Sequence, residues 1–153
     1  MTALSIIIRP GTIADRDKLV EFQIAMAQES EDKGLDTHTL SAGIEYLLDH
    51  PEEGIYLVAE TAGRAAGSLM VTFEWSDWRN GRFWWIQSVY VNPEHRRQGV
   101  YSALHASVRE LARNDTRACG IRLYVEQENS GAQATYSALG MVETHYRLYE
   151  EEF

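Results

Sequence analysis

Cysteine is nearly absent from the sequence, since Cys119 is the only one among 153 residues. A single cysteine excludes an intramolecular disulfide, and this composition is typical of the reducing cytoplasm. Long hydrophobic runs are also absent. The apolar run at residues 4–8 is too short for the core of a signal peptide and has no basic segment before it. Since no stretch has the length needed to cross a membrane, the sequence predicts a cytoplasmic protein.

Basic residues are scarce. The chain has 14 Lys and Arg residues against 23 Asp and Glu residues, which gives a formal net charge of −9. A surface of this sign repels the phosphates of nucleic acids and anionic lipids, so the sequence disfavours nucleic-acid and membrane-surface functions. It suits a cationic partner such as a small-molecule amine, although a negative charge also serves solubility alone.

Several functional patterns are missing as well. The five histidines do not have the spacing of metal ligands, so no metal site is predicted. The glycine patterns of a phosphate-binding P-loop and of a dinucleotide-binding domain are absent, which excludes those nucleotide-binding folds. There is no linker, internal repeat or low-complexity segment. We therefore expect one compact domain over residues 1–153, a natural size for a single core.

What is present is an alternation of strand and helix patterns. Hydrophobic periodicity and turn residues predict strands at residues 5–9, 55–61, 66–75, 83–91, 120–125 and 141–149. Helical spacing predicts one helix after Thr12, one that ends before Pro51, one after Gly99 and one at residues 132–139. The order is β-α-α-β-β-β-α-β-α-β. It indicates an α/β fold in which helices cover the faces of a mixed sheet.

A basic turn precedes the third of these helices. The segment from Val89 to Tyr101 reads VYVNPEHRRQGVY and joins a buried strand to the helix start. A helix N-terminus offers unpaired N–H groups and the positive end of the helix dipole. Gly99 lets the backbone approach a ligand closely, while Arg96 and Arg97 add charge that suits phosphate. We interpret this turn as a pyrophosphate site; the alternative is a solvated turn before an ordinary helix.

Two motifs resemble those of the GNAT superfamily of N-acetyltransferases. The pattern Arg96-x-x-Gly99-x-Tyr101 is similar to the R/Q-x-x-G-x-G/A signature that holds the pyrophosphate of CoA. It departs from the signature at Tyr101, where the family has Gly or Ala. Residues 129–141 are similar to the pattern N-x-x-A-x-x-x-Y-x-x-x-G-F, with Met141 in place of the final Phe. In this family the strand before the pyrophosphate loop carries a bulge, and the sheet is splayed at this fourth strand.

The resemblance implies an acetyl-CoA-dependent N-acetyltransferase and a role for each matching residue. The pantetheine arm of acetyl-CoA would bond to the backbone of Val89, Tyr90 and Val91. The residues implied around the pyrophosphate are Arg96, Arg97, Gln98, Gly99, Val100, Tyr101 and Ser102. Asn129 would contact the co-substrate, and the hydroxyl of Tyr136 would donate a proton to the departing thiolate. A strand N–H, such as that of Val89, would stabilise the oxyanion.

The general base is left open. An alkylamine with a pKa near 10 must lose a proton before it attacks the thioester. Glu74, Glu126 and Glu128 lie near the ends of expected strands, and each is a candidate that acts directly or through water. The alternative for each is a carboxylate that only faces solvent. Of the three, we select Glu74 as the catalytic candidate because of the residues around it.

Those residues form a tryptophan-rich hairpin at positions 74–85, with Glu74 and Asp77 among four tryptophans. Carboxylates and aromatic rings together favour binding of an ammonium group, by charge and by cation–π attraction. The segment is faintly similar to diamine-type acetyltransferases. The alternative is a hairpin that packs in the core or at a homodimer interface. A second function from another class also fits the sequence, namely a non-catalytic acyl-CoA-binding sensor or regulatory module.

Overall fold

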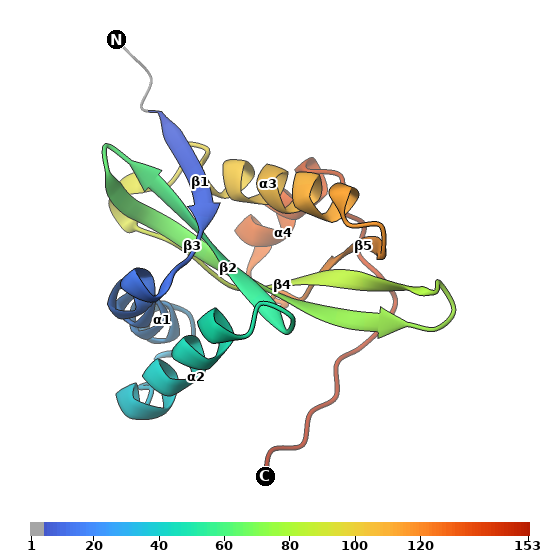
Figure 1. Cartoon of the computed structure of the whole chain (residues 1–153), viewed down its shortest axis with the longest axis horizontal. Coiled ribbons are helices and arrows are strands. Elements are labelled where there is room, and N and C mark those ends of the chain that lie inside the picture. Colours follow the sequence, from blue (N-terminus) through green and yellow to red (C-terminus); the bar gives the residue numbers. More distant parts are fainter. Residues whose placement is uncertain (1–4) are drawn as a thin grey trace. The chain divides into compact units, whose positions relative to one another are not determined.

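The structure, a computed structural model, describes residues 5–153 (Figure 1). It divides into two compact units, the first ending at Leu123 and the second spanning Tyr124–Phe153. The two units are described separately. The expected first strand corresponds to β1 (Ile6–Pro10), while Leu4 of the apolar run lies outside the described residues. The single domain expected over residues 1–153 stays a prediction.

The first unit is built on a five-stranded sheet whose strands lie in chain order. After β1 come β2 (Gly54–Thr61), β3 (Arg64–Ser76), β4 (Gly81–Val91) and β5 (Ala118–Leu123). The first four strands pair antiparallel, whereas β4 and β5 are parallel because a helix connects them. The predicted mixed sheet is therefore confirmed.

Helices cover both faces of this sheet (Figure 1). The helices α1 (Arg16–Glu31) and α2 (Thr37–Asp49) pack on one face, and α3 (Val100–Asn114) packs on the other. Alternate side chains of β2 point to opposite faces of the sheet. Val58 packs with α1 and α2, whereas its neighbours Leu57 and Ala59 pack in the cluster that contains α3. The sheet is thus buried between two helical layers, as the sequence order predicts.

The first half of β4 is fixed to the segment that leads into β5. The carboxylate of Asp115 accepts hydrogen bonds from Arg82 Nε and from the indole Nε1 of Trp84, both at 2.9 Å. The backbone N–H of Arg82 also donates to the carbonyl of Arg117 at 2.8 Å. These contacts hold β5 against β4 near the β3–β4 hairpin.

The second unit contains α4 (Ser130–Ala138), which begins two residues before the predicted helix. Asn129 caps its first turn, because the Oδ1 atom accepts a hydrogen bond from the N–H of Ala132 at 3.1 Å. At the other end Gly140 has a φ of +93° and its N–H donates to the carbonyl of Ser137. This left-handed glycine ends the helix in the usual way.

The closing strand predicted at residues 141–149 is wrong. Residues 141–153 form no strand, and β5 ends at Leu123 rather than at residue 125. In a strand, neighbours such as Leu148 and Tyr149 face opposite sides, yet these two side chains are 68% and 89% exposed. Neither side of the segment is buried. Its apolar residues alone therefore do not make it pair with another strand. The order in the described residues is β-α-α-β-β-β-α-β-α.

Candidate active site

The sheet opens between β4 and β5. These strands pair only from Arg82 to Ile86, whereas β4 keeps β3 as its partner as far as Val91. Beyond Ile86, within the described part of the first unit, no strand pairs with the other edge of β4. The predicted splay at the fourth strand is confirmed. The backbone of residues 87–91 therefore lies at an edge that an extended ligand can join.

A β-bulge lies at the start of this open edge. Ser88 and Val89 together face the single residue Leu69, between the pairs Met70–Gln87 and Ser68–Tyr90. Ser88 has a φ of +53°, in the left-handed region that residues other than glycine rarely adopt. Such a conformation costs about 1–3 kcal/mol and is concentrated at functional sites. The bulge turns the backbone of β4 where it parts from β5.

Tyr90 and Arg96 connect the open edge to α1. The Tyr90 ring packs against Phe22 with centroids 5.2 Å apart, and its hydroxyl donates to Glu29 Oε1 at 3.3 Å. Arg96 donates from its NH2 group to Glu29 Oε2 at 2.7 Å and from Nε to the carbonyl of Val91 at 2.9 Å. The guanidinium of Arg96 thus fixes the loop to the protein. Its direct contact with a pyrophosphate stays a prediction.

The loop ends in an open helix start. Arg97 and Gly99 have left-handed φ values of +63° and +83°, and both residues are exposed together with Gln98. Gly99 is the N-cap of α3 and supplies no side-chain cap, and a Cβ atom there would meet nothing within 4 Å. The space beside Gly99 is therefore open at the positive end of the dipole, where the first-turn N–H groups of a helix lack partners within the helix. This geometry fits a pyrophosphate, with Arg97 and the exposed Ser102 beside it.

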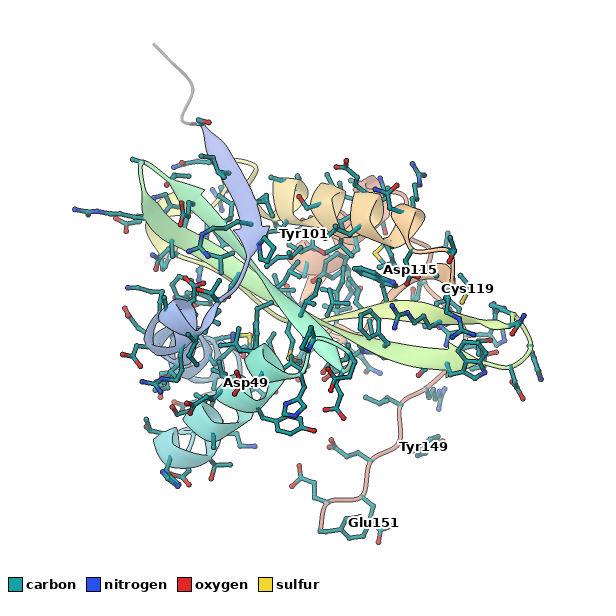
Figure 2. The ribbon with its side chains drawn as sticks, in the orientation of Figure 1. Asp49, Tyr101, Asp115, Cys119, Tyr149 and Glu151 are labelled. Carbon is teal, nitrogen blue, oxygen red and sulfur yellow. The ribbon has the colours of Figure 1, made fainter. Side chains whose placement is uncertain are left out.

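Tyr101 lies on the side of α3 that faces the sheet (Figure 2). Its hydroxyl is 3.1 Å from Nδ1 of the fully buried His105, and the NH2 group of Arg109 is 3.4 Å from Nε2 of the same ring. Burial, and then the charge of Arg109, lower the pKa of His105, so the imidazole is neutral. Arg109 can only donate, which places the ring proton on Nδ1 toward Tyr101. The bulky residue is thus accommodated by the core.

The tryptophan-rich hairpin does not form a cage of four rings. Trp84 is buried and packs edge-on against Phe73, whereas Trp78 at the turn is 87% exposed. Glu74 on β3 accepts a hydrogen bond from the NH1 group of Arg122 on β5 at 2.6 Å. This ion pair balances the charge of Glu74 locally. Its role as general base stays a prediction, as do those of the exposed Glu126 and Glu128.

Tyr136 is half-buried on α4. Burial raises the pKa of its hydroxyl above the usual tyrosine value, so the group remains protonated throughout the neutral range. The loop before α4 is held by Gln133, whose Nε2 atom donates to the carbonyls of Glu126 and Gln127 at 3.1 and 2.8 Å. The Oδ1 atom of Asn129 is used as a helix cap. Contact of Asn129 and Tyr136 with the co-substrate stays a prediction.

Within residues 5–153, no group of three or more His, Cys, Asp or Glu residues is placed to hold a metal ion. Over the same range, no helix combines the length and apolar character required to cross a membrane.

The family resemblance implies a bulge on this strand, but sequence reasoning missed its position at Ser88 and the residues that hold it. Ser88 is not a residue type that favours a positive φ, so nothing in the sequence marks it. Glu29 and Gln23 are polar residues on an otherwise ordinary helix, and each contacts β4 or its loop. In the sequence Gln23 is only a polar residue next to Phe22, and its burial is known from the structure alone.

Comparisons with known proteins agree with this geometry. A sequence profile of the Acetyltransferase (GNAT) family matches residues 14–141. The thialysine N-epsilon-acetyltransferase of Bos taurus is 38% identical over 68 residues, which cover 44% of this chain and 39% of that protein. The chain therefore matches well under half of the length of that relative.

Solved structures share the fold over nearly the whole chain. A possible acetyltransferase from Clostridium difficile 630 has a TM-score of 0.89 and 42% identity, with 97% of each chain covered. The aminoglycoside N-acetyltransferase AAC(6')-Iy, in complex with CoA, has a TM-score of 0.81 and 17% identity. That match covers 99% of this chain and 97% of the other, and at this identity it shows the fold alone.

Proposed function

The chain belongs to the acetyltransferase (GNAT) family, and we propose that it transfers the acetyl group of acetyl-CoA to a primary amine. The observation that carries the proposal is the open edge of β4, which begins at a bulge and leads directly into the open N-terminus of α3. One end of this arrangement suits a peptide-like arm and the other suits a diphosphate. CoA has both groups in that order.

Binding of acetyl-CoA uses mainly the backbone. Its pantetheine arm bonds to residues 89–91 as an added strand would, so the side chains there matter little. The first-turn N–H groups of α3 receive the pyrophosphate, with Arg97 close by. The complex of a protein of this fold with CoA supports acetyl-CoA as the co-substrate.

Transfer needs a polarised carbonyl and a proton donor. The N–H of Val89, in the bulge, stabilises the oxygen that gains negative charge as the amine attacks. The attacking amine gives up a proton to a base, for which Glu74 is our candidate. Tyr136 gives its own proton to the thiolate that leaves and regains one from solvent, and its raised pKa keeps that proton in place at neutral pH.

The acceptor is a small cationic amine. The net charge of −9 attracts such a molecule, and Glu74 and Asp77 add exposed carboxylates on the hairpin. A partial relative is named for transfer to the ε-amine of thialysine, which is an amine of this kind. We place the enzyme in the cytoplasm. Nucleic acids and membranes are not its partners, and a homodimer is the assembly to test.

Release of free CoA thiol tests the function directly. Acetyl-CoA mixed with a panel of amines, amino acids and peptides should yield thiol only in the presence of an accepted amine, with small cationic amines the fastest. Acetyl-CoA binding without thiol release across the panel would favour the non-catalytic sensor. Absence of acetyl-CoA binding would contradict both functions.

The acceptor assignment predicts an effect of Glu74→Gln. Removing this charge should raise the KM for a cationic acceptor about two- to fivefold, the size typical of an exposed charge interaction. Binding of acetyl-CoA should not change. The matched variant is Arg122→Gln, which frees the Glu74 carboxylate from its ion pair and should leave the KM equal or lower. Steady-state kinetics with a cationic and a neutral acceptor measure both.

A different result would reassign the hairpin. If Glu74→Gln changes the molecular mass in solution but not the KM, the hairpin serves a subunit interface. If the enzyme prefers neutral or acidic acceptors and neither variant alters the KM, the charge argument fails.

A further inference from the structure

Gln23 is a polar residue in a buried position. It lies on α1 beside Phe22, and only 5% of its surface is exposed. Its Nε2 atom donates a hydrogen bond to the carbonyl of Ser88 at 3.2 Å. Ser88 is the left-handed residue of the β4 bulge opposite β3, so the bond joins α1 to that bulge. Neither the family motifs nor the proposed chemistry has given Gln23 a role.

The bond also sets the direction of the next N–H. The carbonyl of Ser88 and the N–H of Val89 belong to one peptide unit, which is planar and trans because the described chain contains no cis peptide bond. In a trans peptide these two groups point in opposite directions. When Gln23 holds the carbonyl toward α1, the N–H of Val89 must point away from α1.

A second set of contacts holds Tyr90, the residue that follows Val89 in β4. Glu29, further along α1, accepts a hydrogen bond from the Tyr90 hydroxyl and pairs with Arg96. The residues on both sides of Val89 are therefore tied to one helix, Ser88 through its backbone and Tyr90 through its side chain. Rotation of the Ser88–Val89 peptide would break the first tie while the second kept the strand in place.

We propose that Gln23 is a positioning residue for acetyl transfer, which orients the Val89 N–H toward the oxygen of the reacting thioester. The inference rests on the proposed function. It gives α1 a part in catalysis that is separate from its part in packing. The expected signature is a loss of turnover without a loss of CoA binding, because CoA has no acetyl oxygen.

Gln23→Met tests this role. Methionine has a similar length and fills the buried space but cannot donate to Ser88. We expect kcat to fall about 10- to 100-fold, since a displaced oxyanion donor costs up to about 100-fold, while the Kd for CoA changes little. Gln28→Met is the matched control. Gln28 lies on the same helix, is exposed and contacts Asp32, so its replacement should leave kcat unchanged.

Gln23→Glu adds a pH readout that a packing role would not produce. A carboxylate cannot donate to the Ser88 carbonyl, whereas a protonated carboxyl can, and burial raises the pKa of the introduced group. The ratio of wild-type to variant kcat should therefore decrease as the pH is lowered from about 8 toward about 5. Protonation of the acceptor amine changes the kcat of both proteins equally, so it does not affect the ratio of wild-type to variant kcat.

The outcomes separate this inference from the proposed function. If the wild type transfers acetyl groups and Gln23→Met retains its kcat, the positioning role is overturned and the function stands. An equal loss of kcat and of CoA affinity, or a Gln23→Glu ratio that is independent of pH, also overturns the role. If the wild type transfers no acetyl group to any amine, both are overturned. Melting temperatures confirm that each variant is folded.

Discussion

Replacing Tyr136 with Phe is expected to lower turnover about 100-fold, within the range of general acid catalysis. The change keeps the ring on α4 but removes the proton that the departing thiolate takes. Because burial raises the pKa of Tyr136, the hydroxyl stays protonated throughout the neutral range and can serve as the acid. The affinity for CoA should change little, so the effect belongs to kcat. Single-turnover kinetics with saturating acetyl-CoA give the rate of the chemical step.

Tyr149→Phe is the control for this experiment. Tyr149 lies in the second unit as well, but its side chain is 89% exposed and no motif includes it. The same loss of a hydroxyl there should leave kcat unchanged. A Tyr136→Phe variant with wild-type turnover, under conditions in which chemistry limits the rate, would show that another group protonates the thiolate.

Gly99→Trp is expected to abolish the stabilisation of the protein by acetyl-CoA. At about 100 times its Kd, a ligand that binds only the folded state adds about 2.7 kcal/mol to the free energy of unfolding. An indole at Gly99 would fill the open space before α3 and block the N–H groups that receive the pyrophosphate. The melting temperature with and without acetyl-CoA measures the loss.

The substitution also strains the backbone, because Gly99 has a φ of +83°. Gly63, in the turn between β2 and β3, has a φ of +75° and also has open space around its Cβ position. Gly63→Trp therefore carries a similar strain, about 1–2 kcal/mol, without touching the loop. It should lower the melting temperature of the free protein yet keep the full acetyl-CoA shift. If the Gly99 variant keeps that shift too, the pyrophosphate lies elsewhere.

Most of the fold could be predicted from the sequence because most elements carry a local signal. A capping box formed by Thr12 and Asp15 precedes α1, and the dipeptide Asn80–Gly81, a strong hairpin signal, lies where β3 turns into β4. The segment at 141–149 shows the limit. A strand exists only when its backbone pairs with another strand, and apolar residues without a buried face do not supply that partner.

The candidate site also contains features that the local sequence marks and features that depend on distant residues. The loop around Gly99 is marked by residue types, since a glycine and two arginines directly before a helix together favour an anion site. The bulge at Ser88 is a long-range property, because it depends on the register of β4 against β3 and on a glutamine 65 positions earlier in the chain. The role of Arg96 is equally non-local. Its charged partner is Glu29 on α1, which no spacing rule connects to the loop.

Tyr101 shows why a departure from a motif need not change the function. The family signature has Gly or Ala there, which suggests that the helix start must stay free of bulk. The ring instead turns toward the sheet, where the buried His105 holds its hydroxyl. A histidine four residues later on the same helix face accompanies the substitution, and the two residues form one packed unit. The exposed start of α3 is left clear.

The parting of β4 from β5 after Ile86 affects how proteins of this fold can diverge. Along the open edge the proposed contacts with the ligand use peptide groups, which every amino acid except proline supplies in full. Val89 and Val91 can therefore be replaced by β-branched or other apolar residues without loss of the backbone groups that the edge offers. We expect an alignment of relatives to show this stretch as variable, although it carries the proposed binding surface. We expect sequence conservation instead on α1, at the residues that orient the peptide groups of β4.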